Sequence, residues 1–204
     1  MDKKEILKAY NFRHACKVFD TTKIISDEDF NTILECARLS PTSFGMQGVK
    51  LYVITDKTKK EELKPFCWNQ NQIDSCSHLV VFTTKTEDLK PDSKWVKQRF
   101  DDRGLSDEMR DAYLKRYRDF HQDKDIYEWG AKQTYITMAN MLSVASMLGI
   151  DSCPIEGFEK DNVESVLGID ITKEEVSVIA SFGYRLNSQS KRYRLDLKEM
   201  VESL

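Results

Sequence analysis

The segment YEWGAKQTYITMANMLSVASML, residues 127–148, is apolar on nearly all of its sides when it is drawn as a helix. A helix that is apolar all round belongs in the interior of a protein rather than on its surface. Gly149 follows directly, and glycine is the residue that most often ends a helix in a left-handed conformation. The segment therefore predicts one long buried helix.

Three short apolar runs elsewhere in the chain predict the strands of a small sheet, at residues 49–54, 78–83 and 176–183. The run at 78–83 is apolar enough to lie at the centre of the sheet. Further helices are predicted at 3–10, 58–63 and 164–167. Another is expected from Ser26, where three acidic residues follow a capping residue and the apolar face holds Phe30, Ile33, Leu34 and Ala37.

Helices and strands alternate along the chain without repeats, low-complexity runs or a linker. This organisation predicts one α+β domain over residues 1–204, with a small mixed or antiparallel sheet flanked by helices. The charged segments 90–100 and 106–120 can both be helical. We expect the excursion at about 90–125 to form a lid over a site.

Composition excludes several classes of protein. The 204 residues hold 31 Lys and Arg against 34 Asp and Glu, which argues against a general nucleic-acid or membrane surface. No apolar run approaches the length of a spanning helix and no leader is recognisable, so a cytoplasmic location is predicted. The five cysteines show no CxxC spacing and the three histidines no HxxxH pair, so neither a disulfide framework nor a metal site is expected.

Two compact basic clusters lie near opposite ends of the chain, at residues 13–17 and 191–194. Folding could bring them together around one small anion. The planar fork of an arginine suits a phosphate, which needs several charge-assisted donors when it is buried. The alternative is that both clusters are solvated faces, as most charge runs are.

Six local patterns, taken together, resemble the FMN-dependent nitroreductase family. Their order and spacing match over nearly the whole chain, and they lie at 13–19, 40–43 with Gln47, Asn69 ahead of the strand at 78, 128–133, 154–158 and 192–195. The resemblance implies a nitroreductase-like fold and an intertwined homodimer with FMN at the subunit interface. It further implies ping-pong transfer of electrons from NADH or NADPH to nitroaromatics, quinones or similar acceptors. The flavin carries this chemistry, so no catalytic side chain is predicted.

The resemblance also implies roles for individual residues. Arg13 and Arg194 would hold the FMN phosphate, with Arg192 where the family usually has a second terminal cation. Lys17 would lie near the flavin N1 and O2 edge, where reduction leaves negative charge. The full set of predicted cofactor-binding residues is Arg13, His14, Ala15, Lys17, Pro41, Thr42, Ser43, Gly45, Asn69, Gln72, Pro154, Ile155, Glu156, Gly157, Arg192 and Arg194.

Other parts of the cofactor would be met by three loops. In the family the turn at 40–43 comes from the neighbouring subunit, although by itself it reads as a helix terminus. Asn69 would bond the pyrimidine part of the ring, since an amide both donates and accepts. Glu156 and Gly157 would bring backbone N–H groups near flavin N5, and the glycine permits a close approach.

Aromatic residues are the candidates for contacts with the substrate. Tyr113, Tyr117 and Phe120 lie in the segment that covers the flavin in relatives, and Phe44 and Trp68 are further candidates. The alternative for each residue of the first group is a helix packing stripe.

Three departures from the family pattern bear on substrate preference. Ala15 replaces a common serine, Gln72 stands where some relatives have a second lysine, and the loop at 45–48 contains two glycines. Two alternatives to the enzyme share the cofactor: a non-catalytic FMN-binding redox sensor, and a flavin-modifying or dehalogenating relative. A nucleic-acid module is weaker, because one short basic run cannot neutralise many phosphates.

Overall fold

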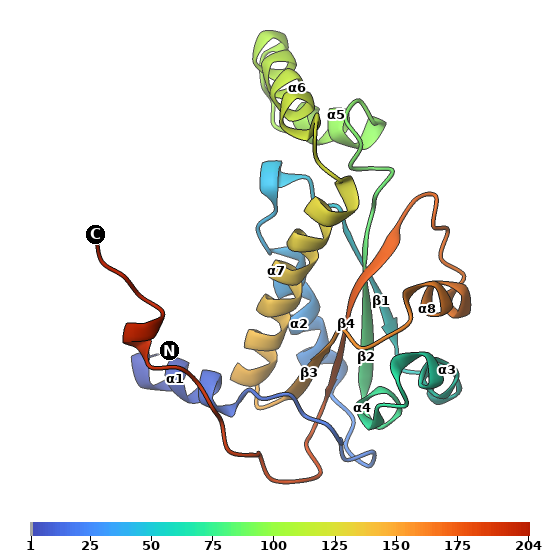
Figure 1. The fold of residues 1–204 in the computed structure, drawn as a ribbon, viewed down its shortest axis with the longest axis vertical. Coiled ribbons are helices and arrows are strands. Elements are labelled where there is room, and N and C mark those ends of the chain that lie inside the picture. The colour runs from blue at the N-terminus through green and yellow to red at the C-terminus, as the bar shows by residue number, and fades with distance from the viewer. Residues whose placement is uncertain (1) are drawn as a thin grey trace.

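The computed structural model describes residues 2–204, and its centre is a four-stranded sheet with helices on both faces (Figure 1). The strands are β1 (Val49–Ile54), β2 (His78–Thr84), β3 (Asp151–Ile155) and β4 (Glu175–Gly183), arranged in the order β1-β2-β4-β3. Every neighbouring pair is antiparallel. The predicted α+β class, the three predicted strands and the central position of the run at 78–83 are confirmed.

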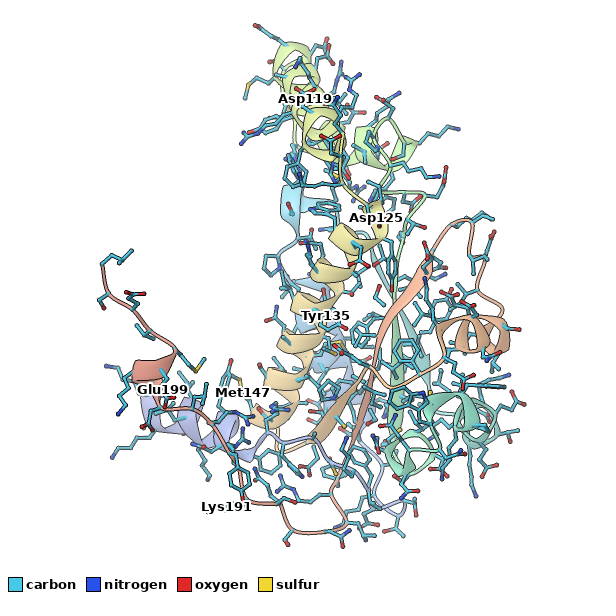
Figure 2. All side chains as sticks on the ribbon, in the orientation of Figure 1. Asp119, Asp125, Tyr135, Met147, Lys191 and Glu199 are labelled. Atoms are coloured by element: carbon cyan, nitrogen blue, oxygen red, sulfur yellow. The ribbon has the colours of Figure 1, made fainter. Side chains whose placement is uncertain are left out.

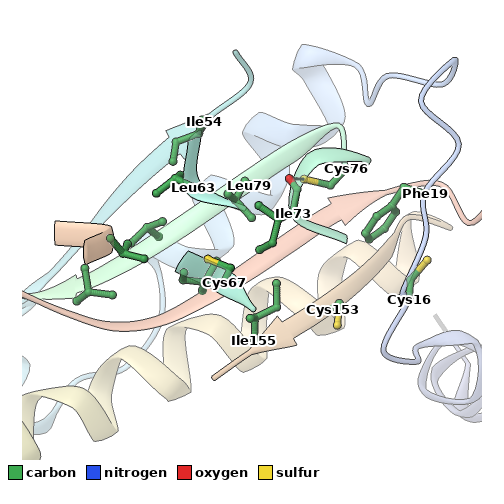
Figure 3. Close-up of a cluster of buried hydrophobic side chains, with 14 of the residues drawn as sticks. Cys16, Phe19, Ile54, Leu63, Cys67, Ile73, Cys76, Leu79, Cys153 and Ile155 are labelled. Atoms are coloured by element: carbon green, nitrogen blue, oxygen red, sulfur yellow. Dashed lines mark hydrogen bonds between the residues drawn. The ribbon is translucent and has the colours of Figure 1, made fainter. Parts of the chain in front are cut away.

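The two faces of the sheet follow from the period-2 alternation along β2. Leu79 and Val81 face a core built with Leu63 and Ile73, whereas Val80 and Phe82 face a second core built with α7. The helices α3 (Lys57–Leu63), α4 (Asn71–Asp74) and α8 (Lys160–Leu167) cover the first face. Figure 3 shows that first core, which also takes in Cys16 and Cys153.

The second face carries the long helix predicted from residues 127–148, observed as α7 (Ile126–Met147), with α2 (Asp27–Arg38) beside it (Figure 1). Ser26 caps α2 by accepting a hydrogen bond from the Asp29 backbone N–H, as predicted. Within a single chain, the expectation that α7 is buried all round is wrong on one side. Its outer stripe, which includes Lys132, Ile136, Ala139 and Met147, is exposed.

Strand β3 was not predicted, and Pro154 explains why. A proline within a run argues against a central strand because it cannot donate to the ladder. Here β3 is an edge strand that pairs with β4 alone among the named strands, so its other side tolerates the missing N–H. The short helix α4 was also missed.

The excursion at 90–125 projects beyond one end of the sheet (Figure 1). It consists of α5 (Lys94–Asp101) and α6 (Asp107–His121), packed around Phe100 and Tyr117. The predicted helix at 90–100 is wrong for its first residues, because Asp92 has a positive φ and Ser93 is the N-cap of α5. Whether the excursion acts as a lid stays a prediction.

The N-terminal helix is tied to α7, and the C-terminal segment is bonded to the end of this N-terminal helix at Asn11. Helix α1 (Lys3–Phe12) starts with a capping box between Asp2 and Glu5 and packs on α7. The remaining elements are the 3₁₀ turns η1 (Ser43–Gly45), η2 (Pro65–Cys67) and η3 (Leu197–Glu199). Within residues 2–204, no helix is both long enough and apolar enough to cross a membrane.

We expect the stability of the protein to fall as the pH drops below about 6.5, because its histidines are held neutral. Burial lowers the pKa of His78, which stacks on Phe30 at 3.9 Å, and Lys60 lowers it further. Burial also lowers the pKa of His14 and of His121. The unfolded chain therefore takes up protons first as the pH falls, which favours unfolding. Urea titrations between about pH 7.5 and 5.5 measure this loss, which should shrink in His78→Gln. A slope that is unchanged in this variant would contradict the assignment to His78.

Candidate functional site

Three arginines from opposite ends of the chain converge on one pocket. The pocket has a volume of about 350 Å³ and is lined by residues 13–15 and 189–194. Figure 2 shows Lys191 where the C-terminal segment passes the end of α1. Burial, followed by the charges of Arg192 and Arg194, lowers the pKa of Arg13. The structure thus brings the two basic clusters together, as the sequence suggested.

These guanidinium groups lack the carboxylate partners that would neutralise them. Arg192 donates to the backbone oxygen of Asn11 at 3.2 Å, and Arg194 donates to the backbone oxygen of Tyr193 at 2.6 Å. Over the described range 2–204, Arg13, Arg192 and Arg194 form no ion pair with Asp or Glu. Like charges gathered in this way repel one another, so the pocket favours an anion.

A buried ion pair that the sequence did not reveal holds this pocket together. Asp151 at the start of β3 is 3% exposed and lies 2.6 Å from the Nη2 of Arg185 through its Oδ1. Its Oδ2 accepts from the backbone N–H of Arg185 at 2.9 Å. Arg185 also donates to the backbone oxygen of Phe12. The pair therefore fixes the segment before Arg13 to the segment that leads to Arg192.

His14 belongs to the same cluster. Its Nδ1 lies 3.5 Å from the Asp151 carboxylate, and burial, together with the nearby charge of Arg185, lowers the pKa of the ring. The pKa of His14 is thus below its usual value near 6.5, so the ring is neutral near pH 7 and adds no charge to those of the three arginines. We interpret its contribution as shape.

The basic segment at 13–17 is held along β3. Ala15 forms a parallel bridge with Ser152, and the Cys16 N–H donates to the Ser152 oxygen at 3.1 Å. Lys17 then reaches across the strand, with its Nζ 3.6 Å from the Sγ of Cys153. Burial raises the pKa of the Cys153 thiol although Lys17 opposes the shift, so the thiol stays protonated.

The segment predicted to contact flavin N5, residues 156–157, lies beside the loop predicted to contact the pyrimidine part of the ring, which holds Asn69. Gly157 packs against Trp68 so closely that a Cβ at residue 157 would lie 2.6 Å from the Trp68 ring. Asn69 is exposed beside it, whereas Gln72 is 2% exposed and donates to the side chain of Gln70 at 2.7 Å. On the other side of the segment, the Tyr135 hydroxyl donates to the Glu156 carboxylate at 2.7 Å. Neither Gln70 nor Tyr135 was singled out from the sequence.

The turn at 41–45 lies apart from these residues. The Ser43 N–H donates to the side chain of Gln133 on α7 at 2.9 Å, whereas Glu156 is bonded to Tyr135 of the same helix. Residues two apart on an α-helix project about 200° from each other. The turn and the Glu156–Gly157 segment therefore lie on opposite sides of α7. Within a single chain they do not meet at one site.

The aromatic substrate candidates fall into two groups. Phe44 packs edge-on against Tyr117 and Phe120, at ring distances of 5.2 and 5.3 Å. Tyr117 is completely buried and donates to the Leu89 oxygen at 2.7 Å, so packing inside the excursion explains the position of this side chain. Trp68, in contrast, is 67% exposed beside Gly157.

Comparison with known proteins gives concordant results. A family model described as the nitroreductase family matches residues 10–184. A Haemophilus influenzae protein named "Putative NAD(P)H nitroreductase" is 41% identical over 99% of this chain and 97% of its own length. A Bacillus subtilis protein with the same descriptive name is 34% identical over 98% and 97%.

Solved structures share the fold over the whole chain. A Bacillus subtilis protein described as a "putative nitroreductase" superposes with a TM-score of 0.86 at 21% identity, covering 100% of both chains. An Exiguobacterium sibiricum protein described as a "putative nitroreductase" in complex with FMN superposes with a TM-score of 0.80 at 23% identity, covering 100% of this chain and 98% of the other.

Proposed function

This chain belongs to the nitroreductase family and is therefore an oxidoreductase, and we propose that it uses bound FMN to carry electrons from NADH or NADPH to nitroaromatics, quinones or similar acceptors. The observation that carries the proposal is the pocket where Arg13, Arg192 and Arg194 gather without carboxylate partners from the described part of the chain. Such a pocket fits the dianionic phosphate of a mononucleotide.

The residues around this pocket fit the rest of the cofactor. Lys17 would serve the pyrimidine edge of the ring, and the backbone at Glu156 and Gly157 would serve the N5 edge. The tight contact between Gly157 and Trp68 leaves no room for a larger side chain at residue 157. When bound, FMN supplies a ring that accepts a hydride from the nicotinamide and passes electrons to the acceptor.

The side chains of this protein would bind and orient rather than transfer protons. Arg13 and Arg194 neutralise the phosphate, and the exposed Trp68 offers a flat surface to an aromatic acceptor. Tyr117 is left out of the proposed substrate contacts because it is fully buried in the excursion. One domain over residues 1–204 and a cytoplasmic location stay predictions.

Steady-state kinetics test the proposed reaction. With NAD(P)H and a quinone or nitroaromatic as varied substrates, a ping-pong order gives parallel double-reciprocal lines. Intersecting lines would contradict that order. A flavin that is reduced but passes electrons to none of these acceptors would favour the redox sensor.

We further propose that the site is completed by a second copy of this chain, because the turn at 41–45 lies across α7 from the Glu156–Gly157 segment. The outer stripe of α7 would form part of the interface. The exposed apolar residues of the C-terminal segment would add to it: Tyr193, Leu195, Leu197, Met200 and Val201. Obligate interfaces of this kind bury about 2,000 Å² or more.

The variant Ile136→Glu is expected to be monomeric and to lose FMN, because it places a charge on the outer stripe of α7. Ile136 is 41% exposed in the single chain, so the substitution should leave the monomer folded. Ile171→Glu is a matched control at a residue that is 61% exposed and outside this face. Sedimentation velocity at micromolar concentration reports the oligomer. A wild-type monomer that retains FMN would overturn the two-chain site.

A further inference from the structure

Two consecutive residues at the predicted pyrimidine side of the site have left-handed backbone conformations. Trp68 has a φ of 55° and Asn69 a φ of 51°. Left-handed conformations are costly for residues other than glycine and persist only where the surrounding structure holds them. Neighbouring backbone bonds, such as that from the Asn69 N–H to the Lys64 oxygen at 3.0 Å, supply part of that hold.

The side-chain amide of Gln70 adds further bonds in the same place. Its Nε2 donates to the Cys67 oxygen at 3.0 Å and to the Gly157 oxygen at 2.8 Å. Its Oε1 accepts from the Nε2 of Gln72 at 2.7 Å. Only an amide nitrogen can face two carbonyl oxygens, so the orientations of Gln70 and Gln72 are both fixed by this chain of bonds.

This amide is a side-chain link between two loops that are distant in sequence. The only backbone bond in the neighbourhood that joins the same loops, among the described residues, runs from the Glu159 N–H to the Phe66 oxygen at 2.8 Å. The close contact of Gly157 with Trp68 means that a shift of either loop displaces the other. The two loops are therefore joined at three points, and Gln70 supplies the hydrogen bonds from its side chain.

We propose that Gln70 is a positioning residue that couples the pyrimidine-side loop at 67–72 to the N5-side segment at 156–157. Where it concerns FMN, the proposal rests on the proposed function. The bonds from Gln70 to the Cys67 and Gly157 oxygens, which we call the clamp, are a property of the protein alone. Gln70 acts through the backbone of Gly157 and through Gln72, and it need not touch the cofactor.

Replacing the amide by a carboxyl group gives a specific test. In Gln70→Glu an ionised carboxylate would face two carbonyl oxygens and donate to neither, which should raise the pKa of that carboxyl. Protonation restores one donor, so the clamp should recover in acid. In Gln70→Met, which has a similar volume and no donor, no recovery is possible. Gln122→Glu is an exposed control that adds the same charge.

Other titratable groups near the clamp are common to all these proteins. Burial raises the pKa of the Cys67 thiol to about 12, and Glu159 adds to that shift. Lys64 pairs with Asp74 at 2.9 Å. A titration that occurs in Gln70→Glu alone therefore belongs to residue 70.

Two measurements are needed, on the full chain. The first is the FMN dissociation constant, followed by flavin fluorescence from about pH 5 to about pH 8. We expect a roughly tenfold or larger weakening for Gln70→Glu at the upper pH, recovery toward wild type at the lower pH, and weakening at every pH for Gln70→Met. The second is amide hydrogen exchange of the FMN-free proteins, in which segments 66–70 and 156–159 should lose protection together in both Gln70 variants.

The outcomes separate the two proposals. If wild type binds no FMN but both segments loosen together, the proposed function fails while the clamp stands. If FMN binds and Gln70→Glu matches Gln122→Glu at every pH, Gln70 does not position the site. Loosening of segment 66–70 alone would show that the loops are not coupled.

Discussion

The double variant Arg13→Ala, Arg194→Ala is expected to be purified without FMN while its apoprotein remains folded. The two guanidinium groups lie at one pocket with Arg192 and have no carboxylate partners within residues 2–204. Losing the charged partner of a desolvated anion costs about 2–5 kcal/mol. Two such losses at the lower end of that range, about 4 kcal/mol, correspond to a roughly thousandfold weaker dissociation constant.

Flavin fluorescence titration measures this constant, and circular dichroism checks the fold. The matched control is Arg116→Ala, Arg118→Ala, which removes the same charge from exposed positions on α6. If the Arg13 and Arg194 variant kept stoichiometric flavin, the pocket at the joined chain ends would not be the phosphate site.

The second large effect is expected at Asp151, which does not line the pocket at the joined chain ends. Asp151→Asn should destabilise the protein by about 3–5 kcal/mol, because it leaves the Arg185 guanidinium without its buried counter-charge. FMN affinity should fall as well, since this pair ties the segment of Arg13 to that of Arg192.

Urea unfolding of the apoprotein gives the change in free energy. Asp119→Asn is the control, because Asp119 pairs with Lys115 at 2.6 Å on the exposed surface, where ion pairs contribute about 0–1 kcal/mol. Equal destabilisation by the two variants would show that Asp151 is no more than a surface partner.

These two predictions illustrate what the sequence could reveal and what it could not. Arg13 and Arg194 stand out because like charges cluster within a few residues, and the family pattern places both clusters. Asp151 and Arg185 pair across 34 positions, and each alone is an ordinary charged residue. Long-range pairing of this kind leaves no local pattern, so only the structure shows it.

The fold was predictable to a similar extent. Apolar runs and a capped acidic start defined β1, β2, β4, α2 and α7. Strand β3 was not predicted because it contains Pro154, which argues against a central strand. The position of β3 at the edge of the sheet explains how Ala15 and Lys17 are held. Tyr117 shared one helical stripe with Phe120, and periodicity cannot distinguish a buried packing residue from one that covers a ligand.

The central claim is that a nicotinamide nucleotide reduces FMN bound to this protein. The most direct test is anaerobic mixing of the purified holoprotein with NADH or NADPH while the visible flavin absorbance is followed. We predict that at least one nucleotide bleaches the bound flavin fully, and that a quinone or nitroaromatic added afterwards restores the colour. A protein that holds FMN yet is bleached by neither nucleotide would contradict the assignment as an NAD(P)H oxidoreductase.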